Sequence, residues 1–280
     1  MLRYLSLFLA LVFYGLSTTL QKKALKYISL RNMLKIHAYV TFILYALFWY
    51  FFSREYRAWP YFYPMLSALT SALGFILYYE ALKFSSASLV ALITSLYAVV
   101  SFVLSVIFLG ECPAWNNYTG FALIIAGLLF IYKKGSGKNI SFKGLILTLS
   151  ATILWGCWGF LSKKAYEHAG EPELLGSFAL MVILIFSLYA GRLKKDEEDS
   201  ATVHRGDKVA ILSVVITAAA SLLFYFSIGR MPATFVIPVI SGYPLITIIS
   251  AAVLLRERLT GRQLFASVLI ICGIMLFFIF

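Results

Sequence analysis

Charged side chains are scarce in this sequence. Only 13% of the 280 residues are Asp, Glu, Lys or Arg, and 61% are hydrophobic, whereas ordinary soluble domains carry roughly 25% charged residues. A water-soluble fold has nowhere to hide that much apolar side chain. Because apolar stretches recur from end to end, we expect the whole chain to be embedded in a membrane, rather than a soluble domain with one anchor.

Signatures of catalysis and of metal binding are also lacking. Three cysteines, Cys112, Cys157 and Cys272, show no paired spacing, so neither a disulfide framework nor a metal site is favoured. The chain has no Walker-type phosphate loop, no His-x-x-x-His run and no Gly-x-Ser-x-Gly motif. These absences argue against direct use of ATP and against an intramembrane enzyme. We therefore predict no catalytic residue and no cofactor.

Acidic residues are outnumbered by basic ones, which gives a formal net charge of +12. In a soluble protein this balance would suggest nucleic-acid binding. Here the basic residues lie in short loops between apolar segments, where membrane topology and anionic lipid head groups explain them better. The predicted partners are membrane lipid and a small molecule, with no nucleic acid.

Ten apolar segments are long enough to cross a membrane, because roughly 20 helical residues span the hydrocarbon core. Helices are expected, since unpaired backbone groups are costly in lipid and the segments are too uniformly apolar for barrel strands. The first apolar segment lacks the A-x-A-like cleavage site of a signal peptide and is interpreted as a helix that stays in the protein. The predicted fold class is an all-α integral membrane protein with ten transmembrane helices, at 3–21, 33–52, 61–82, 87–109, 115–132, 143–161, 173–191, 209–229, 232–255 and 262–280.

An internal repeat relates the two halves of the chain. Residues 141 positions apart match around Gly15 and Gly156 and at two Lys-Lys pairs. Further along, residues 146 positions apart match at Tyr79 and Tyr225, Ser95 and Ser241, Tyr97 and Tyr243, Leu109 and Leu255, and Glu111 and Glu257. The change of offset fits an insertion in the charged connection 192–208.

Each half, 1–136 and 137–280, would hold five crossings. Five is odd, so the second half would enter the membrane from the opposite side. That is the inverted-repeat plan of secondary transporters, whose substrate site lies near the midplane between the halves and whose access alternates. The alternative is a duplication retained only for folding.

Each half carries a motif toward its end. In the first half, Tyr78-Tyr79-Glu80-Ala81-Leu82-Lys83-Phe84 is followed by an apolar run ending in Gly110-Glu111, and in the second half Met231-Pro232 runs to Leu255-Arg256-Glu257. These two stretches resemble the two repeats of the EamA family of the drug/metabolite transporter superfamily. The resemblance implies a ten-helix carrier of small metabolites such as amino acids or nucleobases. Cys112-Pro113 departs from the family pattern and weakens the interpretation of that loop.

The orientation of the termini is contradictory. The family resemblance implies a cytoplasmic N-terminus, which would put 18 of the 24 Lys and Arg residues on the far side. The positive-inside rule alone would place both termini outside.

Ionisable groups inside the predicted helices are few, and such groups are functional candidates because they are costly in lipid. Glu80 is a candidate proton site or counter-charge for a substrate amine; the alternative is an interfacial carboxylate paired with Lys83. His37 is a candidate for proton coupling; the alternative is a histidine hydrogen-bonded at the interface.

The repeated lysines allow two interpretations. Inversion would place Lys22-Lys23 and Lys163-Lys164 toward opposite membrane faces, so a topology signal cannot explain both. One interpretation is snorkelling at the membrane boundary. The other is that Lys22 and Lys163 face a central cavity and attract an anionic substrate.

Aromatic and hydroxyl residues on the predicted interface helices are candidates for lining a cavity suited to planar or apolar solutes, although plain packing is the alternative. With Glu80 and the two lysines, the predicted substrate-binding residues are Tyr78, Tyr79, Ser95, Tyr97, Trp155, Trp158, Tyr225, Ser241 and Tyr243.

Two prolines, Pro238 and Pro244, fall within the segment 232–255 and are candidate gating residues. Each removes a backbone donor, which predicts a kink with exposed backbone polar groups. The alternative is a static kink tolerated by packing. The corresponding stretch of 87–109 keeps hydroxyl groups but has no proline.

The leading functional hypothesis is a secondary transporter, an exporter of small metabolites in the inner membrane, present as a monomer or homodimer. One alternative is a multidrug or cation efflux protein. The segment 3–21 lacks the carboxylate typical of small multidrug-resistance relatives, which disfavours it. The other alternative is a membrane receptor or assembly protein without transport.

Overall fold

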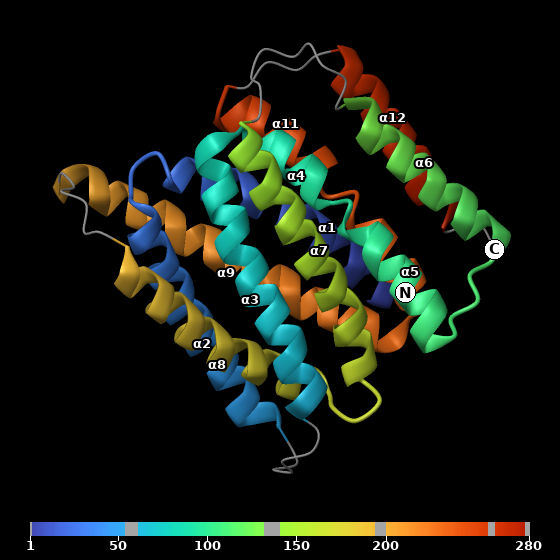
Figure 1. The fold of residues 1–280 in the computed structure, drawn as a ribbon, viewed down its shortest axis with the longest axis horizontal. Coiled ribbons are helices and arrows are strands. Elements are labelled where there is room, and N and C mark those ends of the chain that lie inside the picture. The colour runs from blue at the N-terminus through green and yellow to red at the C-terminus, as the bar shows by residue number, and fades with distance from the viewer. Residues whose placement is uncertain (1, 54–60, 132–140, 194–199, 257–260, 278–280) are drawn as a thin grey trace.

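A computed structural model describes residues 2–53, 61–131, 141–193, 200–256 and 261–277. Its elements are α-helices, and no strand occurs within those ranges (Figure 1). In chain order they are α1 (Leu2–Ala24), α2 (Leu30–Phe52), α3 (Phe62–Phe84), α4 (Ala87–Thr94), α5 (Tyr97–Leu109), α6 (Trp115–Ile131), α7 (Phe142–Ala165), α8 (Glu171–Arg192), α9 (Ser200–Arg230), α10 (Ala233–Ile240), α11 (Pro244–Leu254) and α12 (Gly261–Leu276).

The predicted apolar segments coincide with these helices. Segments 87–109 and 232–255 each contain two consecutive helices, α4 with α5 and α10 with α11. Within the described ranges, eight helical stretches are long and apolar enough to cross a membrane, each of those pairs counting as one. Two further helices, α6 and α12, are shorter, with 17 and 16 residues. Such lengths and compositions are those of a multi-pass membrane protein.

The start of α9 differs from the prediction. The apolar segment was expected at 209–229, but the helix begins at Ser200, inside the stretch 192–208 that was predicted to be a connection. Asp207 and Lys208 therefore belong to the helix. Hydropathy identifies the part of a helix that meets lipid, whereas backbone hydrogen bonding continues into the interface. Residues 194–199 lie outside the described ranges.

Local side chains fix several helix ends. Ser29, Ser86 and Ser141 precede α2, α4 and α7, and each hydroxyl accepts a hydrogen bond from the backbone N–H three residues later. This is the usual N-cap arrangement, which satisfies a donor that the helix leaves free. Gly110 ends α5 with a φ of 64°, a left-handed conformation that glycine adopts without steric cost.

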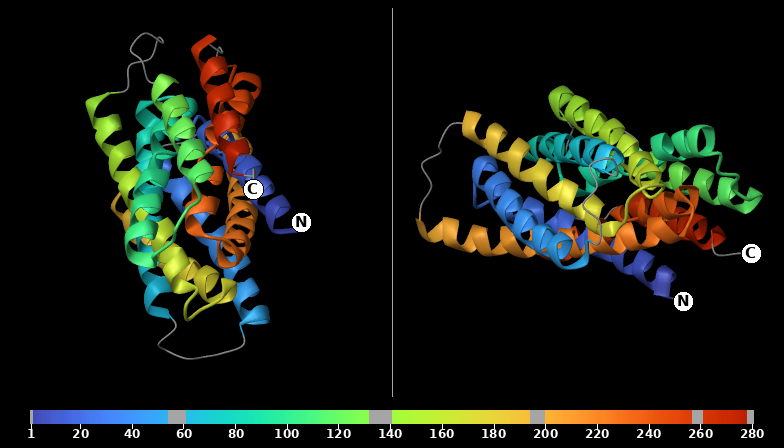
Figure 2. Two further views of the ribbon diagram at one scale, coloured as in Figure 1. Left: turned by 90° about the vertical axis from the view of Figure 1, so that its right-hand side faces the viewer. Right: turned by 90° about the horizontal axis from the view of Figure 1, so that it is seen from below.

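Four helix pairs make most of the contacts: α3 with α7, α1 with α9, α2 with α8, and α6 with α12. Each pair joins a helix from the first half of the chain to one from the second. Figure 1 shows α3 beside α7 in the middle of the bundle, with α2 and α8 on one side and α6 and α12 on the other. Figure 2 shows the bundle from two further directions, with α1 beginning on the side where α12 ends.

Buried hydroxyl groups link the two central pairs. Ser6 Oγ lies 2.8 Å from Ser227 Oγ between α1 and α9, and Ser67 Oγ lies 2.9 Å from Ser162 Oγ between α3 and α7. Lipid tails are as apolar as leucine, so helices in a membrane associate through close packing and such polar contacts rather than through the hydrophobic effect. Serine at these positions is small enough for close packing and supplies the hydroxyl group for the polar contact.

Two of the membrane-crossing stretches are broken in the middle. Residues 95–96 separate α4 from α5, and residues 241–243 separate α10 from α11. The Ser95 hydroxyl donates to the Leu92 carbonyl at 2.7 Å, and the Ser241 hydroxyl donates to the Pro238 carbonyl at 2.6 Å. These contacts correspond, because both pairs are 146 residues apart.

Prolines accompany only the second break. Pro238 lies inside α10, and Pro244 is the first residue of α11. Irregular backbone was predicted there, but the break in 87–109 was not, because no proline marks it. The shared feature is the serine hydroxyl, which takes a carbonyl that the interrupted helix leaves free.

Candidate functional site

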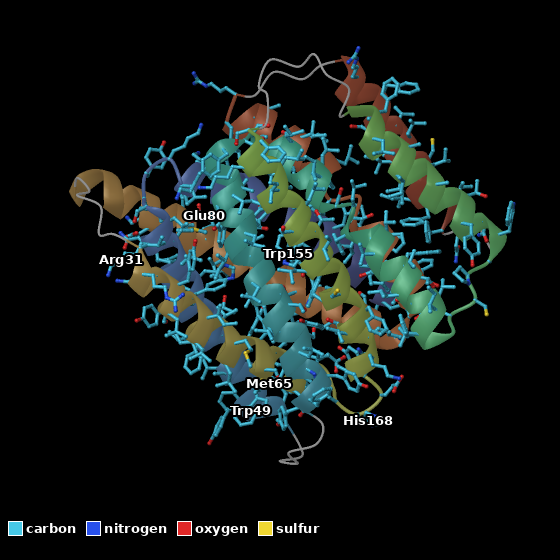
Figure 3. All side chains as sticks on the ribbon, in the orientation of Figure 1. Arg31, Trp49, Met65, Glu80, Trp155 and His168 are labelled. Atoms are coloured by element: carbon cyan, nitrogen blue, oxygen red, sulfur yellow. The ribbon has the colours of Figure 1, made fainter. Side chains whose placement is uncertain are left out.

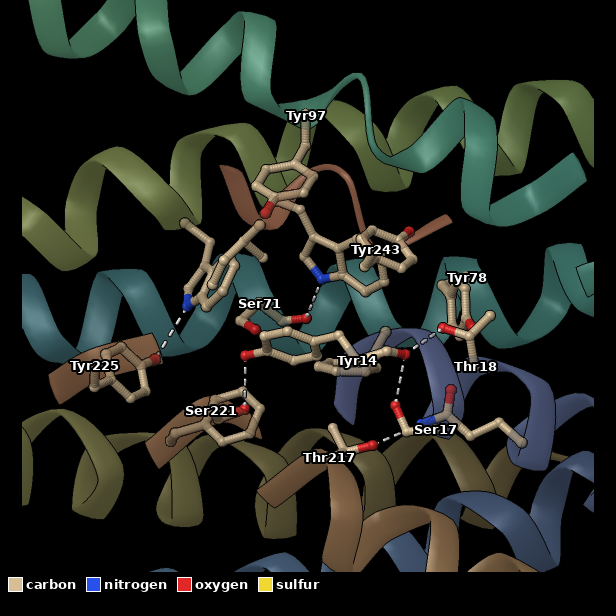
Figure 4. Close-up of a pocket in the computed structure, with 16 residues that line it drawn as sticks. Tyr14, Ser17, Thr18, Ser71, Tyr78, Tyr97, Thr217, Ser221, Tyr225 and Tyr243 are labelled. Atoms are coloured by element: carbon tan, nitrogen blue, oxygen red, sulfur yellow. Dashed lines mark hydrogen bonds between the residues drawn. The ribbon is translucent and has the colours of Figure 1, made fainter. Parts of the chain in front are cut away.

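A cavity of about 60 Å³ lies between α1, α3, α7 and α9 (Figure 4). It is small beside the roughly 300–1,000 Å³ of sites that hold drug-sized ligands. None of the 16 described side chains that line it carries a formal charge. Its chemistry therefore depends on neutral hydrogen-bonding groups and aromatic rings.

One side of the cavity, here called the polar wall, is formed by α1 and α9. The Gln21 amide donates to Thr217 Oγ1 at 3.0 Å, and the Tyr14 hydroxyl donates to Ser221 Oγ at 3.0 Å. The α1 residues recur every three or four positions, which brings them to one face of the helix. The wall consists of hydroxyl and amide side chains: Tyr14, Ser17, Thr18, Gln21, Thr217 and Ser221.

The opposite side, here called the aromatic wall, is formed by α3 and α7 and consists of Phe75, Tyr78, Trp155 and Trp158. The Trp155 indole donates to the Ser71 carbonyl at 3.3 Å. The Trp158 indole donates to the Tyr225 hydroxyl at 3.0 Å. These hydrogen bonds fix the planes of both indoles, so the wall presents oriented rings.

Glycine makes room for one of these rings. A Cβ atom at Gly74 would overlap the indole of Trp155, so only glycine lets the indole lie against α3. Figure 3 shows Trp155 toward the middle of the bundle and Glu80 nearer one end of α3.

Tyr97 and Tyr243 line the cavity at the two helix breaks. Tyr97 is the first residue of α5, and Tyr243 directly precedes α11. The Tyr243 hydroxyl donates to the Ala91 carbonyl at 3.0 Å and lies 2.7 Å from Thr94 Oγ1, which links α4 to the second break. The two broken stretches therefore meet beside the cavity.

Six of the predicted substrate-binding residues line this cavity: Tyr78, Tyr97, Trp155, Trp158, Tyr225 and Tyr243. The others do not. Ser95 and Ser241 are fully buried and bind carbonyls at the breaks. These contacts stabilise the interrupted backbone. Substrate binding by Ser95 and Ser241 stays a prediction.

Tyr79 and His37 form a buried pair behind the aromatic wall. His37 Nδ1 lies 2.6 Å from the Tyr79 hydroxyl. The imidazole also packs against Phe75, with ring centroids 4.9 Å apart, and against Phe186 at 5.2 Å. His37 is only 1% exposed, so it is far more enclosed than an interfacial histidine. Phe75, against which the imidazole packs, is itself a cavity-lining residue.

Glu80 makes the contacts expected of a paired interfacial carboxylate. It accepts from Lys83 at 3.3 Å and from the Tyr189 hydroxyl at 3.0 Å. Because Tyr189 belongs to α8, the carboxylate also joins α3 to α8. These partners account for its charge without a substrate amine.

Lys22 and Lys163 are directed to helix-end carbonyls and are not among the cavity-lining residues. The Lys22 ammonium donates to the carbonyls of Leu82 and Ser85, the latter at 2.9 Å. A helix end leaves carbonyls without intrahelical partners, and a nearby ammonium satisfies them well. This geometry differs from the hypothesis that the lysines face the cavity.

Lys163 repeats the arrangement in the second half. Its ammonium donates to the carbonyls of Ile228 and Met231, both at 2.9 Å. These carbonyls lie 146 positions after those that Lys22 binds. The internal repeat noted in the sequence thus extends to tertiary contacts.

A model of the EamA-like transporter family matches residues 1–133 and again residues 142–279. The chain belongs to the EamA-like transporter family. The resemblance seen in the sequence motifs is thereby confirmed, and the chain is a multi-pass membrane transport protein rather than a member of an enzyme family.

Two bacterial relatives of this EamA-like chain are named "Probable amino-acid metabolite efflux pump". The protein from Salmonella typhimurium is 30% identical over 217 residues, which cover 74% of this chain and 73% of the relative. The protein from Escherichia coli is 29% identical over 199 residues, covering 67% of this chain and 66% of the relative.

Two further matches concern the architecture. An uncharacterised protein of Methanocaldococcus jannaschii is 40% identical over 132 residues, which cover 47% of this chain but 93% of that protein. A solved crystal structure shares the fold of this EamA-like chain with a TM-score of 0.76 and 13% identity, covering 97% of this chain and 94% of the other.

The polar wall of the EamA-like chain was not predicted from the sequence. Tyr14, Ser17, Thr18 and Gln21 were visible as polar interruptions of the first apolar segment, but their role was not inferred. The available signal was their spacing of three, one and three residues, which is that of one helix face. Their partners on α9 come from about 200 positions away, as the separation of 196 between Gln21 and Thr217 shows.

Proposed function

We propose that this chain is a secondary transporter of the cell inner membrane that exports small organic metabolites, such as amino acids, nucleobases or related solutes. The central observation is the buried, uncharged cavity between helices of the two halves. The names of the bacterial relatives support amino-acid metabolites as the first class to test.

The mechanism we propose is alternating access between two inverted five-helix repeats, 1–136 and 137–280. Corresponding contacts at the helix breaks and at the two lysines support this arrangement. Two separate matches of one family model support it as well, as does a relative of about half the length.

Reporter fusions test the five-plus-five plan. Ten crossings place both termini on one side and the connection after the fifth crossing on the other. Fusions after Lys134 and after Phe280 should therefore report opposite sides. Matching signals would contradict the plan, and a fusion after Lys195, beyond the seventh crossing, is the control because it should agree with the Lys134 fusion.

The cavity favours solutes without a net charge. Burying an ion without a partner costs several kcal/mol, and the described lining offers no carboxylate to a cation and no ammonium to an anion. A zwitterion or a neutral amphiphile fits better, with its polar part on the polar wall and its apolar part on the aromatic wall. This chemistry disfavours the alternative of cation efflux.

Counterflow in proteoliposomes is the direct test of transport. Vesicles preloaded with pooled amino acids and nucleobases should accumulate one or more labelled members of the pool. The Tyr97→Ala and Tyr243→Ala variants should lose most of this activity. Tyr39→Ala is the matched control, because Tyr39 is 56% exposed on α2. No accumulation of any labelled solute by folded protein would overturn the proposal.

A further inference from the structure

The two repeated lysines connect opposite walls of the cavity. Lys22 extends from α1, in the polar wall, to the end of α3, in the aromatic wall. Lys163 extends from α7, in the aromatic wall, to the end of α9, in the polar wall. Each lysine therefore joins two walls that would have to separate for a solute to enter.

The two connections lie at opposite ends of the cavity. Ser67, near the start of α3, contacts Ser162, which directly precedes Lys163. Lys22 instead binds Leu82 near the end of α3. Leu82 follows Ser67 by 15 helical positions, which corresponds to about 22 Å along the helix. The cavity-lining residues of α3, Ser71 to Tyr78, lie between these two points.

Each lysine contact is strong enough to hold two helices together, and water can replace it when the helices separate. Hydrogen bonds from a charged donor are roughly twice as strong as neutral ones. Their acceptors are backbone carbonyls at helix ends, which water satisfies equally when the contact opens. An ammonium buried against carbonyls can thus be released into water without leaving an unpaired group behind.

Glu111 strengthens the second connection. Its carboxylate accepts from the backbone N–H groups of Ala233 at 2.8 Å and Thr234 at 2.7 Å, at the start of α10. The junction between α9 and α10 is therefore held through its carbonyls by Lys163 and through its amides by Glu111. The corresponding residue of the other half, Glu257, lies outside the described ranges.

We propose that Lys22 and Lys163 are positioning residues that act as two latches, each of which holds one end of the cavity closed. In the conformation described here the contacts of both lysines are formed. Transport then requires one latch to open while the other stays closed. This inference rests on the proposed transport function, but its test needs no substrate.

Side-specific labelling of a cavity cysteine tests the latches. The background variant replaces Cys112, Cys157 and Cys272 with alanine and carries Ser17→Cys as the reporter on the polar wall. A membrane-impermeant maleimide is applied to right-side-out and to inside-out vesicles. Labelling rates from the two sides then report which end of the cavity opens.

Lys22→Gln should raise the labelling rate from one side only, and Lys163→Gln from the opposite side only. We expect an increase of roughly tenfold or more, because charge-assisted hydrogen bonds shift a two-state population by such factors. Lys23→Gln and Lys164→Gln are matched controls and should leave both rates unchanged. Lys164 is paired with Glu167 at 2.7 Å instead.

Increases from the same side, or from both sides equally, would overturn the proposal. Unchanged rates in folded Gln variants would overturn it too. If a Gln variant fails to fold, Lys22→Arg and Lys163→Arg keep the charge but alter its geometry, and each should raise labelling from its own side by a smaller factor. If the folded Arg variants were labelled at the same rates as the background variant, the latch would be refuted. A negative counterflow result would refute transport and leave these measurements intact.

Discussion

Ser101 on α5 donates its hydroxyl hydrogen to the carbonyl oxygen of Gly156 on α7, 2.5 Å away. The corresponding contact exists in the other half, where the Thr247 hydroxyl on α11 donates to the Gly15 carbonyl on α1 at 3.1 Å. Both contacts require a backbone carbonyl to be reachable from a neighbouring helix. Glycine at positions 15 and 156 permits that approach.

Substitution of either glycine should destabilise the fold. A Cβ atom at Gly156 would overlap the side chain of Val100, and one at Gly15 would overlap Ile246. We expect Gly156→Val and Gly15→Val to cost about 1–3 kcal/mol, the usual range for overpacking. Thermal unfolding in detergent measures the loss as a lower midpoint. Gly191→Ala, where an added Cβ meets nothing within 4 Å, should leave the midpoint unchanged or raise it. Equal midpoints for all three variants would contradict the close-packing argument.

The hydrogen bond between Gln21 and Thr217 should matter for substrate affinity more than for folding. Removing a neutral hydrogen bond from a site costs about 0.5–1.5 kcal/mol. Gln21→Leu and Thr217→Val should therefore raise the apparent KM by roughly three- to tenfold. Thr119→Val is the control, since Thr119 is exposed on α6 and bonds only its own helix. An unchanged KM in both wall variants would mean that the polar wall does not contact the substrate.

We expect the helix breaks to depend on the hydroxyl groups of Ser95 and Ser241 rather than on proline. Pro244 is the first residue of α11, a position where proline costs the helix nothing, and the first break forms without any proline. Pro244→Ala should thus keep most of the counterflow activity. Ser95→Ala and Ser241→Ala should reduce it severalfold, because each frees a buried carbonyl. Loss of activity in Pro244→Ala alone would show that the proline, as the sequence suggested, is a gating residue.

His37 is the better placed of the two candidates for proton coupling. It is buried and hydrogen-bonded to Tyr79, whereas the charge of Glu80 is already matched by Lys83. We expect His37→Gln to abolish transport driven by a pH gradient while counterflow persists, because exchange needs no net proton movement. Glu80→Gln should retain both activities, as should His168→Gln in the exposed connection after α7. Gradient-driven transport that survives His37→Gln would exclude this histidine as the coupling group.

The sequence by itself determined the membrane class, the approximate positions of the helices and the family. These are local properties: an apolar run of about 20 residues has to be a helix in lipid, whichever neighbours it finds. The repeat was also visible, since matching residues recur at fixed offsets. The aromatic lining was predicted in part for the same reason, through the repeated tyrosines at positions 97 and 243.

Only the tertiary structure decided what the polar residues contact. Lys22 and its acceptor Leu82 are 60 positions apart, and Lys163 and Ile228 are 65 apart. No local pattern distinguishes a lysine that faces a cavity from one that binds a distant helix end. The break between α4 and α5 was missed for a related reason, because a serine hydroxyl replaces the expected proline. Hydropathy fixes how deep a residue lies in the membrane, but the packing of α1 on α9 and of α3 on α7 fixes the direction it faces.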